Sequence, residues 1–267
     1  MFKRVLIKLS GEFLAGALDE TAGSTAQHYD ESVCTRIVGE INEARNLGTQ
    51  ACIVIGGGNF WRGAEAPGMD RAKADHMGML ASVMNAVYLS DKFKDAGARA
   101  RVMTPFHMGP FADCYNQDAA DAYLTAGDVL IFAGGTGQPF FSTDTISAIR
   151  SAELHADCVL FAKGVAGVCD RDPKRLAIGE TYGVYREITC RMMIRDNLTV
   201  VDMAAAQILM QQQLDARLFD IRVKGGIVAA CAGDEKILGI GTKIYYHRDQ
   251  EWEDNACRSI QTLTKTK

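Results

Sequence analysis

The sequence lacks a long apolar run and any excess of positive charge. No window approaches the ~18 apolar residues that a transmembrane helix requires. Lysine and arginine total 29 against 33 aspartate and glutamate residues, which gives a net charge of -4. This balance predicts neither a membrane protein nor a nucleic-acid-binding protein. An anion site, if present, must be built from a few local groups.

Several familiar motifs are also missing. There is no G-x-x-x-x-G-K-[ST], and GGGNFWRG fails G-x-G-x-x-G because Trp61 occupies the third glycine position. Without H-E-x-x-H, and with five scattered histidines, we expect no dedicated zinc site. Eight cysteines without a C-x-x-C pair predict buried thiols in a reducing cytosol. The apolar part of MFKRVLIKLSGE is too short for a signal peptide, so we expect a cytoplasmic protein.

Short apolar runs predict strands of a parallel sheet. Most are continuously apolar rather than alternating, as expected for strands covered on both faces. They cover residues 4–10, 51–56, 100–105, 128–134, 158–163 and 216–221. With helical patterns between them, these runs predict one large α/β domain or two tightly joined lobes.

Between the strands, apolar residues repeat every three or four positions and predict helices. The four groups are Val33, Ile37, Ile41, Ala44 and Leu47; Met77, Leu80, Met84 and Val87; Ile146, Ile149 and Leu154; and Ala206, Met210 and Leu214. We expect the methionine-rich stripe to be core and Asp144 to be an N-cap. Residues 15–31 are predicted to form an exposed loop, and the polar tail 248–267 a short helix or a disordered end.

The chemistry is expected where strands end. Ligands of open α/β sheets bind beyond the carboxyl ends of the strands. One strand is followed by Lys8, Ser10, Gly11 and Glu12, and the next by GGGNFWRG with Arg62. Later strands are followed by GGTGQPFFSTDT and by KGVAGVCDRDP. Glycines admit backbone N–H groups close to an anion, and cations neutralise it, so these ends predict phosphate or nucleotide binding.

The stretch GGTGQPFFSTDT allows two interpretations. Its glycines would donate to a phosphate, Pro139 and the phenylalanines would cover a flat ring, and Ser142 and Thr143 would meet a polar edge. Alternatively, it is a tight turn followed by the N-cap Asp144, which does not by itself require Thr136, Pro139 and both phenylalanines.

At these residues the sequence resembles the bacterial-type UMP kinases of the amino-acid kinase superfamily. The matching stretches, in family order over residues 3–245, are KRVLIKLSGE, VIGGGNFWRG, ADHMGMLASVMNAV, FAGGTGQPFFSTDT and VVDMAAAQIL. The resemblance implies a three-layer α/β/α sandwich around a mainly parallel sheet. It implies a kinase domain over residues 1–247, with an acceptor-binding part over 1–157, an ATP-binding part over 158–247 and a polar tail over 248–267.

The resemblance also implies an activity. ATP and UMP would give ADP and UDP, with Mg²⁺ bound to the ATP, in pyrimidine nucleotide synthesis by a homohexamer. GTP or UTP would be effectors. Implied catalytic residues are Lys8, Arg62 and Asp144. Implied UMP-binding residues are Gly57, Asp75, Thr136, Gly137, Gln138, Pro139, Phe140, Phe141, Ser142 and Thr143. Implied ATP-binding residues are Lys8, Leu9, Ser10, Gly11, Gly58, Arg62, Lys163, Cys169 and Asp172.

The sequence departs from the family pattern on the expected ATP side. Residues 163–169 read KGVAGVC where the family has Thr-Lys-Val-Asp-Gly-Val-Tyr, so an acid and an aromatic residue are replaced. Lys163 is either a second phosphate cation or a solvated or paired lysine. The family's Gly-Phe-Gly-Ile-Asp segment, tied to GTP activation, is not visible in residues 15–31, and Gln138 replaces the common asparagine.

Two other functions stay open from the sequence. The altered 163–169 segment favours a nucleotide-binding relative that no longer catalyses, with a storage or regulatory role like that of the molybdenum storage proteins. The intact Lys8, Arg62, Asp75 and Asp144 oppose this interpretation. A kinase of a small acid such as carbamate or acetylglutamate is opposed by the PFFSTD and DHMGML stretches.

Overall fold

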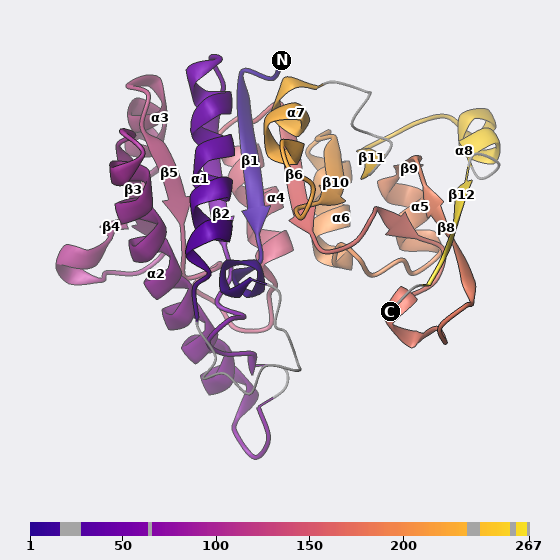
Figure 1. Ribbon diagram of the computed structural model, residues 1–267, viewed down its shortest axis with the longest axis horizontal. Coiled ribbons are helices and arrows are strands. Elements are labelled where there is room, and N and C mark those ends of the chain that lie inside the picture. Colours follow the sequence, from indigo (N-terminus) through magenta and orange to yellow (C-terminus); the bar gives the residue numbers. More distant parts are fainter. Residues whose placement is uncertain (17–27, 64–65, 234–240, 257–259, 266–267) are drawn as a thin grey trace.

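A mainly parallel sheet forms the centre of the molecule (Figure 1). The computed structural model describes residues 1–16, 28–63, 66–233, 241–256 and 260–265. In these residues nine strands pair in the order β4-β3-β5-β2-β1-β6-β10-β11-β9, and all neighbours are parallel except β10 and β11. The strands are β1 Arg4–Leu9, β2 Gln50–Ile55, β3 Ala100–Thr104, β4 Asp113–Cys114, β5 Val129–Phe132, β6 Cys158–Lys163, β9 Glu187–Thr189, β10 Ala216–Asp220 and β11 Gly241–Tyr245.

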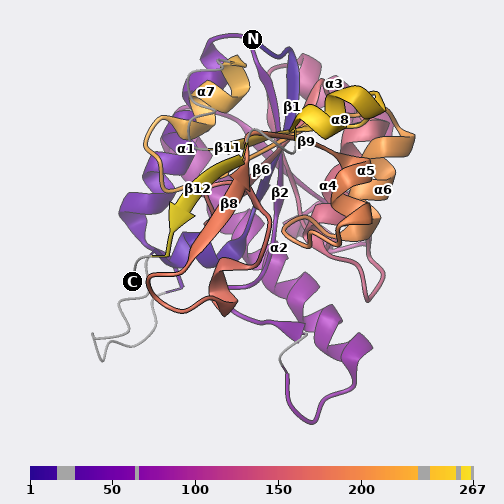
Figure 2. The same ribbon diagram turned by 90° about the vertical axis from the view of Figure 1, so that its right-hand side faces the viewer.

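Helices cover both faces of this sheet, as Figure 2 shows in side view. Helices α1, α2 and α7 pack on one face, and α3, α4, α5 and α6 on the other. Their bounds are α1 Glu31–Asn46, α2 Arg71–Asp95, α3 Gln117–Thr125, α4 Thr143–Glu153, α5 Cys190–Arg195, α6 Met203–Gln211 and α7 Gly226–Ala232. The expected three-layer α/β/α architecture is confirmed.

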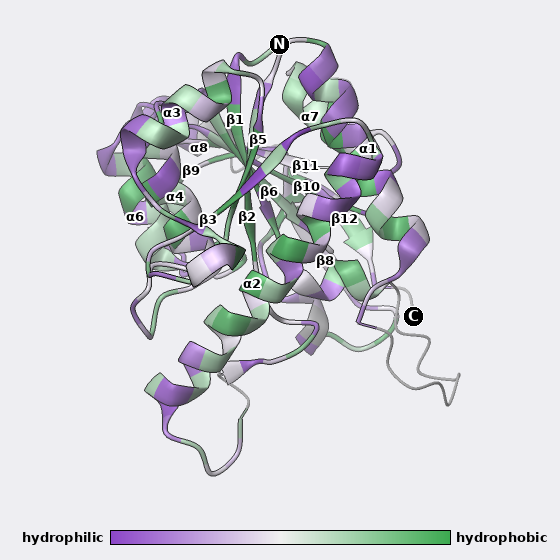
Figure 3. Ribbon diagram, turned by 90° about the vertical axis from the view of Figure 1, so that its left-hand side faces the viewer, coloured by the Kyte–Doolittle hydropathy of each residue, from purple (hydrophilic) through white to green (hydrophobic). Residues whose placement is uncertain are grey.

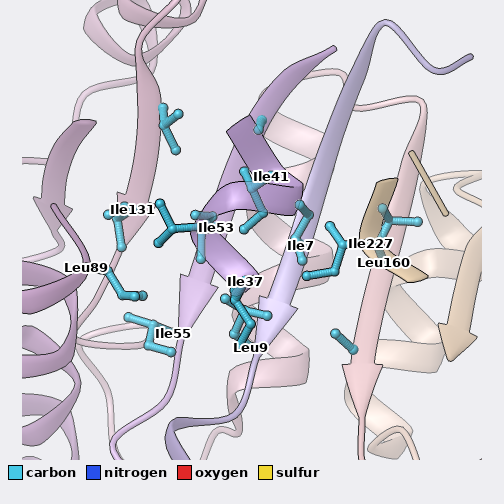
Figure 4. Packing of buried hydrophobic residues seen from close by; sticks show 14 of the residues in the cluster. Ile7, Leu9, Ile37, Ile41, Ile53, Ile55, Leu89, Ile131, Leu160 and Ile227 are labelled. Carbon is cyan, nitrogen blue, oxygen red and sulfur yellow. The ribbon is translucent and has the colours of Figure 1, made fainter. Parts of the chain in front are cut away.

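Six strands lie where the apolar runs predicted them, namely β1, β2, β3, β5, β6 and β10. Successive side chains of a strand point to opposite faces. In β1, Ile7 and Leu9 join the cluster under α1 and α2, whereas Leu6 joins the cluster under α3 to α6. Figure 4 shows Ile7, Leu9 and Ile53 packed against Ile37 and Ile41 of α1. The central strands are therefore mostly hydrophobic in Figure 3, while the helices are mixed.

The expectation that the methionine-rich stripe of α2 is core was wrong. Met77, Leu80, Met84 and Val87 are the exposed side, with 39%, 51%, 49% and 42% of their surface accessible. The buried side carries larger apolar residues at Val83, Leu89 and Phe93, and small and polar residues in the middle of the helix, among them Ala81, Ser82, Asn85 and Ala86. Glycine-rich turns approach α2 so closely that large side chains would not fit there.

A second, three-stranded sheet completes the molecule beside β9 and β11. Its order is β12-β8-β7, with β7 Val168–Cys169, β8 Thr181–Tyr185 and β12 Ile260–Thr264. The tail from residue 248 thus forms helix α8, Gln250–Ala256, and strand β12. Most of the loop expected over residues 15–31 lies outside the described residues. Among the described helices, none has the length and apolar character needed to cross a membrane.

Two residues of the same predicted helical stripe test the packing. Ile41 is fully buried, whereas Leu47, the last residue of the stripe, caps α1 and is 55% exposed. We expect Ile41→Ala to lower the free energy of unfolding by about 2–5 kcal/mol, because a cavity is left behind. Leu47→Ala should change it by no more than about 0.5 kcal/mol. Urea denaturation measures both, and equal losses would contradict this packing.

Candidate active site at the carboxyl ends of the strands

A buried charge cluster lies where β1, β6 and α4 meet. Asp144 lies in the first turn of α4, Lys8 near the end of β1, and Lys163 is the last residue of β6. The Lys8 ammonium is 3.2 Å from Asp144 Oδ1, and the Lys163 ammonium donates to Asp144 Oδ2 at 2.5 Å. Each carboxylate oxygen therefore faces a different lysine. We call Lys8, Asp144 and Lys163 the charge triad.

Further donors and acceptors fix the lysines of the charge triad. Lys8 donates to Ser10 Oγ at 2.8 Å, and Lys163 also donates to the carbonyl oxygen of Val200. Asp144 Oδ1 is buried and accepts no hydrogen bond, although the Lys8 charge lies beside it. With two ammonium groups around one carboxylate, the cluster carries a net positive charge suited to an anionic ligand.

Burial and charge oppose each other in this cluster. Burial raises the pKa of the Asp144 carboxyl, but the charges of Lys8 and Lys163 outweigh it and hold that pKa below its usual value. Burial lowers the pKa of Lys163, and Asp144 offsets this effect only in part. Asp144 is therefore a fixed anion that orients two cations rather than a proton acceptor.

The start of α4 is fastened from two sides. Its N-cap is Ser142, whose Oγ accepts from the N–H of Asp144 at 2.9 Å, so the sequence prediction of Asp144 as N-cap was wrong. Ser142 Oγ also donates to Asp202, and Thr145 Oγ1 donates to the same carboxylate at 3.0 Å. Asp202 in turn caps α6, so α4 and α6 begin at a shared carboxylate.

The glycine turns after β1 and β2 lie against each other and against α2. A Cβ on Gly11 would lie 2.5 Å from the carbonyl oxygen of Gly56, and one on Gly57 would lie 2.5 Å from that of Gly78. Both positions therefore require glycine. Asn85, fully buried on α2, donates to the carbonyl oxygen of Gly56 at 2.7 Å. Leu9 is buried, and its carbonyl oxygen accepts from the Gly56 N–H of this turn at 3.0 Å.

The loop after β5, residues 134–142, is tied to α2 at both ends. The Gly134 N–H donates to Ser82 Oγ at 2.8 Å, and the Phe140 N–H donates to Asp75 Oδ2 at 2.9 Å. Phe140 has φ +72, a left-handed conformation uncommon for a bulky residue, and it persists because Asp75 holds it. Within the loop, Thr136 Oγ1 accepts from the Gln138 N–H, and Gly137 donates to the Gly134 carbonyl.

Aromatic surface is available on this loop. Phe140 and Phe141 are 68% and 55% exposed, and Pro139 precedes them. Thr143, the first residue of α4, lies next to Gly56, because its Cγ2 is 3.6 Å from where a Cβ on Gly56 would be. The loop therefore brings the glycine turn, α2 and the start of α4 together.

The remaining implied site residues, Arg62, Cys169 and Asp172, lie outside the charge triad. Arg62 pairs with Glu12 at 2.5 Å, and Glu12 lies beside Gly58, so the turns after β1 and β2 share an ion pair. Cys169 lies on β7, and burial raises the pKa of its thiol to about 11. Asp172 follows β7 and lies 3.5 Å from Arg175.

Comparison with known proteins identifies the family. The model of the amino acid kinase family matches residues 3–220. The chain belongs to the amino acid kinase family. The structure of a UMP kinase from Bacillus anthracis is similar, with 33% sequence identity, 99% of each chain covered and a TM-score of 0.81. A UMP kinase from Ureaplasma parvum has 28% identity over 92% of this chain and 99% of its own, with a TM-score of 0.80. A uridylate kinase from Archaeoglobus fulgidus, at 18% identity and a TM-score of 0.66, shares the fold.

Three residues of this amino acid kinase were missed by sequence reasoning. Ser82, Asn85 and Asp202 each hold a loop of the site. A signal for the first two existed: they are polar residues on the small-residue side of α2, three positions apart and seven and ten residues after Asp75. Asp202 stands before an apolar helical run, as N-caps do, but its bonds to α4 are long-range and leave no local pattern.

The charge triad gives a stability test. Asp144→Asn leaves two buried ammonium groups without their carboxylate, which costs about 3–5 kcal/mol of unfolding free energy. Burial already lowers the pKa of Lys163 in the wild type, and loss of the Asp144 carboxylate, which offsets that effect, lowers it further in the variant, so the stability of the variant rises more steeply with pH. In the wild type, the Asp144 contribution is fully present above the usual aspartate pKa and is lost as the pH falls below it. Urea unfolding at about pH 7 and about pH 9 compares the two proteins. If the difference in unfolding free energy between the wild type and Asp144→Asn did not become smaller from about pH 7 to about pH 9, this explanation would be contradicted.

Proposed function

We propose that the protein is a UMP kinase, which transfers the γ-phosphoryl group of ATP to UMP and forms ADP and UDP. The observation that carries this proposal is the position of the charge triad, which lies between the glycine turns after β1 and β2 and the segment that follows β6. It is supported by similarity to a UMP kinase over 99% of both chains. We further propose a role in cytoplasmic pyrimidine nucleotide synthesis, the pathway step that consumes UMP.

The loop 134–142 is proposed to bind UMP. Its glycines and the Gly57 turn would present backbone N–H groups to the phosphate, and the start of α4 would add a favourable dipole. Asp75, Phe140 and Phe141 would meet the ribose and the uracil ring, with Thr136 to Thr143 around them. The ties of Asp75 and Ser82 to this loop support a preformed acceptor site.

The triad is proposed to stabilise the transferring group. Phosphoryl transfer needs alignment of two substrates and neutralisation of charge, with little covalent help from the protein. Lys8 and Lys163 would neutralise the charge that develops on the equatorial oxygens, while Asp144 keeps both ammonium groups in place. No protein base is required, because a phosphate monoester has a second pKa of about 6 and is already a nucleophile near neutral pH. Ser10, Gly11, Gly58 and Arg62 would contact the ATP phosphates.

Mg²⁺ is proposed to arrive as part of the MgATP substrate. Among the described residues, no three histidine, cysteine or acidic side chains gather in a group that would hold a metal ion. The Asp144 carboxylate already faces two ammonium groups, so it is a poor ligand for a further cation. Mg²⁺ commonly keeps several waters and binds through substrate phosphates, and this site fits that mode.

ADP release with MgATP and UMP tests the proposed activity. CMP, carbamate, acetylglutamate and no acceptor serve as controls. We expect release that depends on UMP. Binding of UMP without turnover would favour the storage or regulatory alternative, and turnover with carbamate or acetylglutamate would favour the small-acid kinase.

Lys8→Ala tests the role of the triad in the reaction. Removing one well-placed electrostatic donor should lower kcat by about 10²- to 10³-fold. Lys3→Ala, an exposed lysine just before β1, is the matched control and should leave kcat unchanged. Near-wild-type turnover of the Lys8 variant would remove Lys8 from the mechanism.

We also propose a homohexamer built from dimers. The exposed side chains of Met77, Leu80, Met84 and Val87 form a continuous apolar stripe on α2, and a second copy of this chain would cover it. Leu80→Asp with Met84→Asp is expected to reduce the mass measured by light scattering. Retention of the wild-type mass would show that this stripe is not the interface.

A further inference from the structure

The end of the chain folds back onto the segment that follows β6. Helix α8 is anchored by Glu253, which is 2% exposed and accepts from Thr189 Oγ1 at 2.5 Å and from Arg191 Nε at 3.1 Å. Beyond it, β12 runs antiparallel to β8 through five residue pairs, from Ile260 opposite Tyr185 to Thr264 opposite Thr181. Figure 2 shows β12 lying along β8 at the front of the molecule.

Without β12, the outer part of β8 would have little to hold it. The inner ends of β7 and β8 are fixed by β11, because Thr242 Oγ1 accepts from the Val168 N–H at 2.8 Å and donates to the Tyr185 carbonyl at 2.5 Å. The two strands pair through Val168 with Tyr185 and Cys169 with Val184, and this pairing ends before it reaches Tyr182 or Thr181. Two-stranded ribbons are marginally stable in water, and a third strand with an apolar face stabilises them. Ile260 supplies this contact, because a Cβ on Gly183 would lie 2.3 Å from Ile260 Cγ2. Gly183 in turn exchanges two 2.9 Å hydrogen bonds with Asp170.

The residue after β12 holds the loop between β7 and β8. The Lys265 N–H donates to the Glu180 carbonyl at 2.8 Å, and the Gly179 N–H donates to the Lys265 carbonyl at 3.1 Å. The Lys265 ammonium donates to the carbonyl oxygen of Leu176 at 2.7 Å. The tail therefore fixes both β8 and residues 176–180.

Sheet order places this loop on the donor side. The proposed acceptor loop follows β5 and is tied to α2, which lies on one side of β1. Strand β6, which ends in Lys163 of the triad, lies on the other side of β1 and continues into residues 164–180. Donor and acceptor approach the transferring phosphoryl group from opposite directions, so the donor nucleotide extends toward this segment.

We propose that β12 and Lys265 form a positioning element for the donor-nucleotide site. They act through β8 and residues 170–180, which they hold in one conformation, so that Cys169 and Asp172 are in place before the nucleotide binds. This inference rests on the proposed function, because ATP is taken as the donor. It gives the tail from residue 248 a function, namely to position the donor-nucleotide site.

Removal of residues 260–267 tests the proposal. We expect KM for ATP to rise by about tenfold, since a loop that is correctly shaped one-tenth of the time lowers the apparent affinity by that fraction. KM for UMP and kcat should stay within about twofold, because the acceptor loop and the triad lie on other elements. Limited trypsin digestion should cut faster at Arg171 and Arg175, two exposed residues of this loop.

A point variant separates the positioning role from loss of folding. Ile260→Asp places a carboxylate at Gly183, where Asp170 already lies close, and should reproduce the rise in KM for ATP and the faster cleavage. Thr264→Asp adds the same charge to an exposed position of β12 and should behave like the wild type. Unchanged KM for ATP and unchanged cleavage in both the shortened chain and Ile260→Asp would overturn the proposal. A parallel rise in the KM values of both substrates would also overturn it.

Failure of the proposed function would look different. If the wild type turns over no UMP, the UMP kinase assignment fails, and ATP binding by calorimetry together with trypsin digestion then tests the tail. Weaker ATP binding and faster cleavage of the shortened chain would uphold the positioning role, and wild-type values of both would refute it.

Discussion

The site depends on one buried carboxylate. Asp144 lies between Lys8 and Lys163, and removal of its carboxylate leaves two ammonium groups uncompensated in a place that water hardly reaches. Three segments far apart in the sequence must therefore meet at one point, namely the end of β1, the first turn of α4 and the end of β6. Asp202 and the Val200 carbonyl extend this constraint to α6, because one holds the start of α4 and the other holds Lys163. The result is a rigid positive centre at one edge of a parallel sheet.

Helix α2 also determines the geometry of the site, and its two sides have different surroundings. One side contacts the glycine turns and the loop after β5, and the other is exposed. Its inward side is small and polar, so glycine turns approach its backbone closely and receive hydrogen bonds from Asn85, while Ser82 and Asp75 accept from the loop after β5. Its outward side is apolar at Met77, Leu80, Met84 and Val87. Larger side chains at Ala81 or Asn85 would displace the glycine turns, whereas the buried Leu89 and Phe93 lie further along the helix, so the small inward residues are a requirement of the site.

Much of the fold followed from local pattern, whereas the site followed only in part. Continuous apolar runs identified six strands because burial on both faces leaves a signal in each strand separately. The stripe of α2 was assigned to the wrong side, because periodicity reports that a helix has an apolar side and not what covers it. Lys8 was singled out as a phosphate cation from its place at the end of a strand, whereas the catalytic roles of Lys8 and Asp144 were implied by the family resemblance. For Lys163 the sequence left open a phosphate cation or a solvated or paired lysine. Its pairing with Asp144 requires β1, β6 and α4 to meet, and no local sequence pattern encodes that contact. Long-range contacts also explain the wrong N-cap prediction. The Asp144 carboxylate pairs with the two lysines, and Ser142 caps the helix instead.

In the proposed mechanism, the γ-phosphoryl group is transferred from ATP to UMP at the charge triad. Transfer of the labelled group in a single turnover is the most direct test of this mechanism. Wild-type protein and a Lys163→Met variant would each be mixed in excess over labelled MgATP with saturating UMP. The account predicts that label appears in UDP with the wild type and that its appearance is strongly slowed in the variant, while ATP is still bound. Equal rates of label transfer in the two proteins, or label released from the wild type as free phosphate rather than UDP, would contradict it.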